Sequence, residues 1–185
     1  MRDLFGYFFL LFVLPLAGYA QRPVQPEESP GVSLLPAALG LLSEYIAIPS
    51  ESGNEAPAGR FLMDYCSAKG LHIRAFDSDT SGINFAASLY PLDSGKPNII
   101  FLNHIDVVHP GDPGDWDHPP YSGAMAGQKV WGRGSLDNKG LAVIQIMAVS
   151  EYVSLAKNID LPYNVSILSV SGEETGGQRG SAIIA

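Results

Sequence analysis

The sequence has one cysteine, an excess of acid over base, and no apolar run long enough for a comfortable membrane span. Cys66 is the only cysteine among 185 residues, which excludes an intrachain disulfide and leaves a buried, inert thiol as the expectation. Eleven Lys and Arg face 19 Asp and Glu, for a net charge of -8. Because nucleic acid is bound by basic surfaces, this balance argues against a nucleic-acid partner. The apolar content of 46% excludes general disorder and is enough for a globular core.

The N-terminus has the three parts of a secretory signal peptide. Arg2 precedes an apolar run over residues 4–16, and small residues, Gly18 and Ala20, stand at the −3 and −1 positions of a cut after residue 20. The run is shorter than the roughly 20 residues of a membrane span. We therefore expect residues 1–20 to be a signal peptide and the protein to be secreted or periplasmic, with an uncleaved anchor as the alternative. Residues 21–32, which contain several prolines, are expected to be a leader.

Hydrophobic periodicity predicts helices that alternate with short apolar strands. Helices are predicted over residues 33–48, 55–69 and 136–155, and strands over 72–76, 83–90, 98–102 and 163–170. Asn54 is the predicted cap of the second helix, and Gly70 suits the position after its end. The apolar run over 98–102 is typical of a buried central strand. This alternation indicates an α/β fold with a mostly parallel sheet flanked by helices over residues 33–185.

Three clusters of metal-type ligands follow predicted strands or begin a helix. The first holds His104 and Asp106, which share one side of a strand because they are two residues apart. The second places Asp137 at the start of an apolar helix, and the third is the pair Glu173 and Glu174 after a strand. Sites in open α/β sheets form at the carboxyl ends of strands, so position and chemistry agree.

Each cluster taken alone also has an ordinary explanation. His104 could be a core or surface histidine, Asp137 could be a helix N-cap, and the Glu pair could belong to a solvated loop. The glycines at 132 and 134 resemble a nucleotide-binding loop, but the third glycine of a dinucleotide site and the Gly-Lys-Ser/Thr ending of a P-loop are absent. The combination of all three clusters in this order is what indicates a metal site.

Together with the segments between them, the clusters resemble the M20 family of metallopeptidases, the aminoacylase/carboxypeptidase G2-like family. The resemblance extends over residues 34–185, and the segments around residues 119–123 and 131–134 look most like its carboxypeptidase S-like branch. The matching stretches are His104-Ile-Asp-Val-Val, Trp116-Asp-His-Pro-Pro-Tyr-Ser-Gly123, Trp131-Gly-Arg-Gly-Ser-Leu-Asp137-Asn-Lys-Gly140 and Gly172-Glu-Glu-Thr-Gly-Gly177.

The resemblance implies a role for each site residue. His104 is expected to bind one zinc ion, Asp137 to bridge two, and Glu174 to bind the other, with Co²⁺ or Mn²⁺ as substitutes. Asp106 is expected to orient His104, and Glu173 to act as the general base toward the attacking water. The substrate class is a peptide or an N-acyl amino acid, and the longer parent is expected to be a homodimer. The resemblance also implies a cis peptide bond between Asp137 and Asn138.

The family uses two further ligands, an acidic residue and a late histidine, which do not occur among residues 175–185. The resemblance therefore implies an N-terminal part of a longer enzyme, inactive by itself, without the family's dimerisation domain. A non-catalytic secreted binding module with the same fold is the alternative. If the enzyme interpretation holds, His104, Asp137 and Glu174 converge at one end of the sheet, each a few positions beyond a buried anchor, expected at Leu102, Leu136 and Val170.

Overall fold

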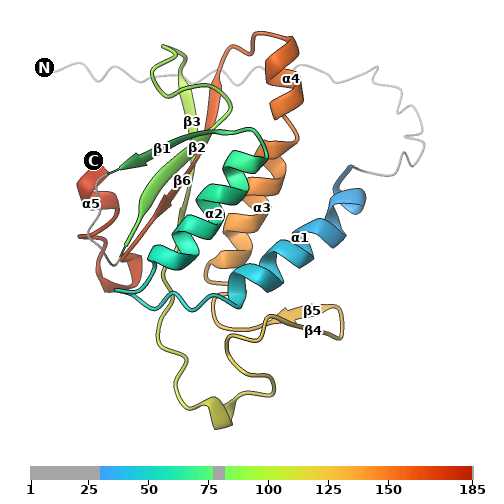
Figure 1. Cartoon of the computed structure of the whole chain (residues 1–185), viewed down its shortest axis with the longest axis vertical. Coiled ribbons are helices and arrows are strands. Elements are labelled where there is room, and N and C mark those ends of the chain that lie inside the picture. The colour runs from blue at the N-terminus through green and yellow to red at the C-terminus, as the bar shows by residue number, and fades with distance from the viewer. Residues whose placement is uncertain (1–29, 77–81, 185) are drawn as a thin grey trace, which may run out of the picture.

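The computed structural model describes residues 30–76 and 82–184; the predicted signal peptide lies outside them. In these residues, helices and strands both occur, as predicted, but they do not alternate regularly: two helices come first, five strands follow, and two more helices precede the last strand (Figure 1). The elements are α1 (Pro30–Ile46), α2 (Ala56–Ala68), β1 (His72–Phe76), β2 (Asn84–Ser88), β3 (Asn98–His104), η1 (Pro113–Asp115), β4 (Ala124–Ala126), β5 (Lys129–Trp131), α3 (Lys139–Ser150), α4 (Val153–Asn158), β6 (Asn164–Val170), η2 (Glu173–Thr175) and α5 (Ser181–Ile184).

Four strands form a mixed sheet in the order β1-β2-β6-β3. β3 and β6 pair in parallel, whereas β2 is antiparallel to both β1 and β6. The α/β class with flanking helices is thus confirmed, but the prediction of a mostly parallel sheet is wrong for the described strands. Among these strands, parallel pairing occurs only between β3 and β6, the two that lead into the predicted site. The connection between β1 and β2 is too short for a crossover helix, which explains why this pair is antiparallel.

The three long helices lie on the same side of the sheet (Figure 1). α2 packs on β1 and β2, α3 packs on β3 and β6, and α1 packs on α3. The core between these layers contains Leu62 and Cys66 of α2, Ile146 of α3, and Phe85 and Ile167 of the sheet, all buried. Cys66 is free, as expected, and burial raises the pKa of its thiol to about 12, so the thiol is inert.

The end of α2 agrees with its prediction, but its start does not. Gly70 follows the helix in a left-handed conformation with φ of 86°, which suits glycine. The predicted cap at Asn54 is wrong, because the N-cap position belongs to Glu55, whose side chain makes no capping hydrogen bond there. The carboxylate of Glu55 instead lies 3.4 Å from the Nη2 atom of Arg179.

β3 is an edge strand, and the prediction of a buried central strand is wrong for the described part of the chain. Ile100 is 55% exposed, and the other apolar residues of the strand are similarly open: Ile99, Phe101 and Leu102. Leu136 is 91% exposed, so of the three expected anchors only Val170 is buried. An apolar run without alternation predicts that both faces of a strand are covered. It does not show which part of a protein covers them.

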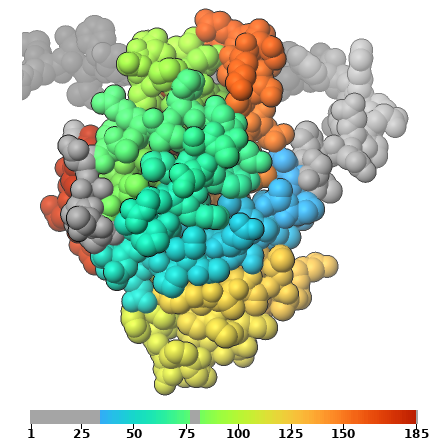
Figure 2. Space-filling model, in the orientation of Figure 1, coloured from blue at the N-terminus to red at the C-terminus, as the bar shows by residue number. Residues whose placement is uncertain are grey.

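A hairpin of β4 and β5, absent from the prediction, lies within the connection from β3 to α3. Its turn residues Gly127 and Gln128 have φ values of 58° and 61°, the left-handed pair that a tight hairpin turn requires. This connection forms a lobe beside α1 (yellow in Figures 1 and 2). The hydroxyl of Ser43 donates to the carbonyl of Gly123 at 2.7 Å and joins the lobe to the helix.

Apolar length alone would make residues 139–158 a candidate membrane span. However, α3 occupies most of this segment and packs on the sheet through Ala142, Ile146 and other buried residues. Packing of this kind is typical of the core helix of a globular domain.

Candidate metal centre

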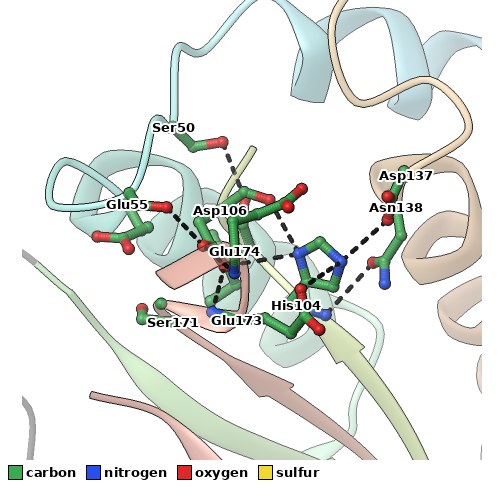
Figure 3. Close-up of polar contacts among 12 residues, drawn as sticks. Ser50, Glu55, His104, Asp106, Asp137, Asn138, Ser171, Glu173 and Glu174 are labelled. Carbon is green, nitrogen blue, oxygen red and sulfur yellow. Dashed lines mark hydrogen bonds and ion pairs between the residues drawn. The ribbon is translucent and has the colours of Figure 1, made fainter. Parts of the chain in front are cut away.

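The parallel pairing of β3 and β6 places the predicted site residues at one end of the sheet. His104, the last residue of β3, is opposite Val170, the last residue of β6. The chain leaves β6 through Ser171 and Gly172 and enters η2, which begins with Glu173 and Glu174. Asp137 approaches from the segment before α3 (Figure 3). Register between two parallel strands therefore brings together residues that are 70 positions apart in the sequence.

His104, Asp137 and Glu174 form a cluster of possible metal ligands. One ligand atom from each residue lies within 4.8 Å of the others. The Nε2 atom of His104 is 3.0 Å from the Oδ1 atom of Asp137. The predicted convergence of the three residues at one end of the sheet is therefore confirmed. An imidazole and two carboxylates are ligands that zinc accepts.

The other ring nitrogen of His104 is held by Asp106. Nδ1 lies 3.0 Å from the backbone carbonyl oxygen of Asp106 and 3.5 Å from its carboxylate. Since a carbonyl can only accept, Nδ1 donates to it, which leaves Nε2 as the ring nitrogen that faces the cluster. Without a metal, Nε2 donates to the carboxylate of Asp137, and a cation would take the place of that proton. Asp106 thus fixes the orientation of His104 chiefly through its main chain.

The carboxylate of Asp106 serves a second purpose, because it binds the turn that carries the two glutamates. Its two oxygens accept the backbone N–H groups of Glu173 and Glu174, each at 3.0 Å (Figure 3). Ser52 donates its hydroxyl to the same carboxylate at 2.7 Å. Burial alone would raise the pKa of Asp106, but the surrounding donors outweigh burial and hold it below its usual value.

The segment before α2 reaches Asp106 because it runs beside residues 105–107. Val107 donates its N–H to the carbonyl of Ser50, and the Ser50 hydroxyl donates to the carbonyl of Ile105, both at 2.9 Å. Glu51 and Val107 form a parallel bridge. These contacts place Ser52 against Asp106.

Two charge effects mark the cluster. Burial alone would lower the pKa of His104, but contacts with Asp106 and Asp137 outweigh it and raise the pKa to about 9. The pKa of Glu174 is raised by burial and then by the negative charge of Asp137. Carboxylates that repel one another beside an imidazole are a donor set that a divalent cation would stabilise.

The turn that carries Asp137 is tied to both neighbouring elements. Asn138 accepts the backbone N–H of His104 through its side-chain oxygen at 3.3 Å. The peptide bond between Asp137 and Asn138 is cis, as the resemblance implied. Glu173 lies near the cluster without belonging to it: its carboxylate is 58% exposed and 3.8 Å from Nε2 of His104.

The structure brings all five predicted site residues together. Sequence reasoning missed Ser52, Asn138 and Lys139, which touch the site residues or hold the segment that carries Asp137. Asn138 and Lys139 stand within a matching motif, so their position was a usable signal. Ser52 offered none, since its contact depends on chain segments 54 residues apart.

Comparison with known proteins supports the resemblance. The model of peptidase family M20/M25/M40 matches residues 100–185. A probable carboxypeptidase of Arthroderma gypseum is 35% identical over 150 residues, which are 76% of this chain and 32% of that protein. A succinyl-diaminopimelate desuccinylase of Blochmanniella pennsylvanica is 27% identical over 145 residues, 78% of this chain and 37% of that protein.

Solved structures show the same fold. An M20 family metallo-carboxypeptidase of Sulfolobus solfataricus superposes with a TM-score of 0.64 at 24% identity, covering 76% of this chain and 32% of that one. Human carnosine dipeptidase 1 gives a TM-score of 0.62 at 27% identity, with coverage of 79% and 34%. The chain spans about a third of the length of these relatives. By its motifs, its fold and these relatives, the chain carries a region of peptidase family M20/M25/M40 over residues 100–185.

Proposed function

We propose that the complete protein hydrolyses peptide or N-acyl amino acid bonds and that His104, Asp137 and Glu174 contribute ligands for two zinc ions. The observation that carries this proposal is the approach of their ligand atoms to within 4.8 Å of one another. Asp137 lies 3.0 Å from His104 and has two carboxylate oxygens, which suits a bridging role between two cations. When bound, zinc polarises a scissile carbonyl and lowers the pKa of water.

Two side chains around the ligands, Glu173 and Asp106, have separate roles in the proposed reaction. Glu173 is exposed and close to His104, which suits a general base that takes a proton from the attacking water and returns it to the leaving amine. Asp106 keeps Nε2 of His104 directed at the cluster and fixes the turn of Glu173 and Glu174. Substitution of Glu173 would therefore lower turnover by removing the base. Substitution of Asp106 would lower it by displacing His104 and the turn of Glu173 and Glu174.

The substrate class rests on the relatives. Their names describe carboxypeptidases, a desuccinylase and a dipeptidase. We extend to this protein the chemistry that these names share, cleavage of an amide bond next to an amino acid. The pattern of residues 1–20 supports action outside the cytoplasm.

The test compares Glu173→Gln with Glu174→Gln in the complete protein. Glu173→Gln should keep its bound metal and lose about 10²–10⁴-fold in turnover, because an amide cannot accept the proton. Glu174→Gln should lose bound metal. Metal content by elemental analysis and amide hydrolysis are measured on the same samples, and dialysis against a chelator followed by Zn²⁺ or Co²⁺ controls for reversibility. The opposite pattern of metal content would refute the assignment.

A further inference from the structure

Lys139, the first residue of α3, is completely buried two positions after Asp137. Its Nζ atom donates to the carbonyl of Tyr45 at 2.9 Å and to that of Ile48 at 2.7 Å. It also lies 4.5 Å from the centroid of the Tyr45 ring. In the part of the chain that the structure describes, Lys139 forms no ion pair with a carboxylate. All the groups that stabilise this ammonium therefore belong to the end of α1 and the residues just after it.

A buried ammonium without a carboxylate is expensive, and burial lowers the pKa of Lys139 to about 7. A methionine of similar volume would fill the space without this cost. Carbonyls at a helix C-terminus attract a cation, and an aromatic face adds to this attraction. These contacts hold the Lys139 side chain at one defined place at the end of α1. A methionine has no donor for the carbonyls and would not be held there.

The loop before α3 is wrapped around the same side chain. The N–H of Lys139 donates to the carbonyl of Gly134 at 2.8 Å. Gly134 has a φ of 88°, and a Cβ there would meet Val107 at 2.8 Å and the Cγ atom of Lys139 at 3.1 Å. A side chain at position 134 would therefore displace Lys139. Asp137 lies on this loop with its own side chain 77% exposed, so its position depends on its neighbours.

We propose that Lys139 is a positioning residue for Asp137, which holds the metal-binding loop against the end of α1 while Asn138 holds it against β3. This inference rests on the metal site of the proposed function. If Lys139 served only to stabilise α1, the expected result would be different. Loss of Lys139 would then lower stability without a specific effect on metal binding.

The experiment measures Co²⁺ binding by the complete protein, with its visible absorption spectrum and its unfolding temperature. Lys139→Met is compared with Ile146→Ala, which removes a buried side chain from the same helix about two turns away. Lys139→Met should weaken Co²⁺ binding about 10–100-fold and alter the ligand-field bands, as loss of support behind a ligand does. Ile146→Ala should lower the unfolding temperature and leave the affinity and the bands unchanged.

If Lys139→Met does not fold, Lys139→Gln serves in its place, because the amide can still donate to one of the two carbonyls. Co²⁺ affinity equal to that of the wild type in a folded Lys139 variant would overturn the positioning role and leave the metal site standing. Equal loss of affinity in Ile146→Ala would also overturn it. Absence of Co²⁺ binding by the wild-type complete protein would overturn the metal site itself, and this inference with it.

Discussion

The hydroxyl of Ser52 lies 2.7 Å from the Oδ2 atom of Asp106, across 54 positions of the chain. This contact connects the loop before α2 to the residue that supports both His104 and the glutamate turn. Ser52→Ala should lower the free energy of unfolding by about 1.5–3 kcal/mol, because it removes a hydrogen bond to a buried charge. Urea denaturation measures the change. Ser94→Ala, in an exposed turn, is the control and should have little effect.

Asp106→Asn should disturb the glutamate turn more than its small change in volume suggests. Both carboxylate oxygens accept a backbone N–H, whereas an amide offers one oxygen and turns its NH₂ toward the other N–H. We expect a loss of about 1–3 kcal/mol in the free energy of unfolding and a 10–100-fold loss in metal affinity. Asp64→Asn, exposed on α2, is the matched control. Wild-type affinity in Asp106→Asn would contradict the dual role of this carboxylate.

Glu55 and Arg179 should behave as a coupled pair. Glu55 is completely buried, and its carboxylate contacts both terminal nitrogens of Arg179 at 3.4–3.5 Å. Arg179→Met leaves the buried carboxylate without this partner and should cost about 3–5 kcal/mol. The double variant with Glu55→Gln should be more stable than Arg179→Met alone. A double-mutant cycle from thermal unfolding tests this, and strict additivity would refute the coupling.

The stability of the metal-free chain should carry a pH-dependent contribution from His104. The folded state raises the pKa of His104 from 6.5 to about 9. Its contribution is therefore complete below pH 6.5 and is lost as the pH rises through 9, for a change of up to about 3 kcal/mol. The measurement is the free energy of unfolding from pH 6 to 10 in the presence of a chelator.

The lowered pKa of Lys139 acts in the opposite direction, since it favours the folded state as the pH rises from 7. The His104 contribution is therefore obtained as the difference between the wild type and His104→Gln. His72→Gln, exposed on β1, is the control and should follow the wild-type curve. If the curves of His104→Gln and the wild type are parallel over this range, the pKa of His104 is not raised.

The sequence was sufficient to predict which elements carry the site. The end of an apolar strand, the start of an apolar helix and a Glu pair identified His104, Asp137 and Glu174, and the strand register explains why they meet. The contacts of the residues that support the site could not be predicted in this way. Ser52 contacts Asp106 across 54 positions, and no local pattern encodes this contact. Lys139 stands in a matching motif, but the motif does not reveal its partner Tyr45, which is 94 positions away.

The arrangement of the sheet was also only partly predictable. Apolar runs correctly predicted strands, but periodicity does not reveal pairing order, so the antiparallel β2 and the edge position of β3 could not be foreseen. The start of α2 differs from the prediction by one residue, because Glu55 rather than Asn54 occupies the N-cap position and directs its side chain to Arg179.

The free edge of β3 has a consequence for handling the chain in solution. Its outer backbone groups can pair with a strand of another molecule, and apolar side chains on both faces would be buried by such pairing. Segments of this kind add to one another edge to edge and seed cross-β aggregates. The 185-residue chain should therefore precipitate increasingly with concentration, and a lysine at position 100 should keep it dispersed.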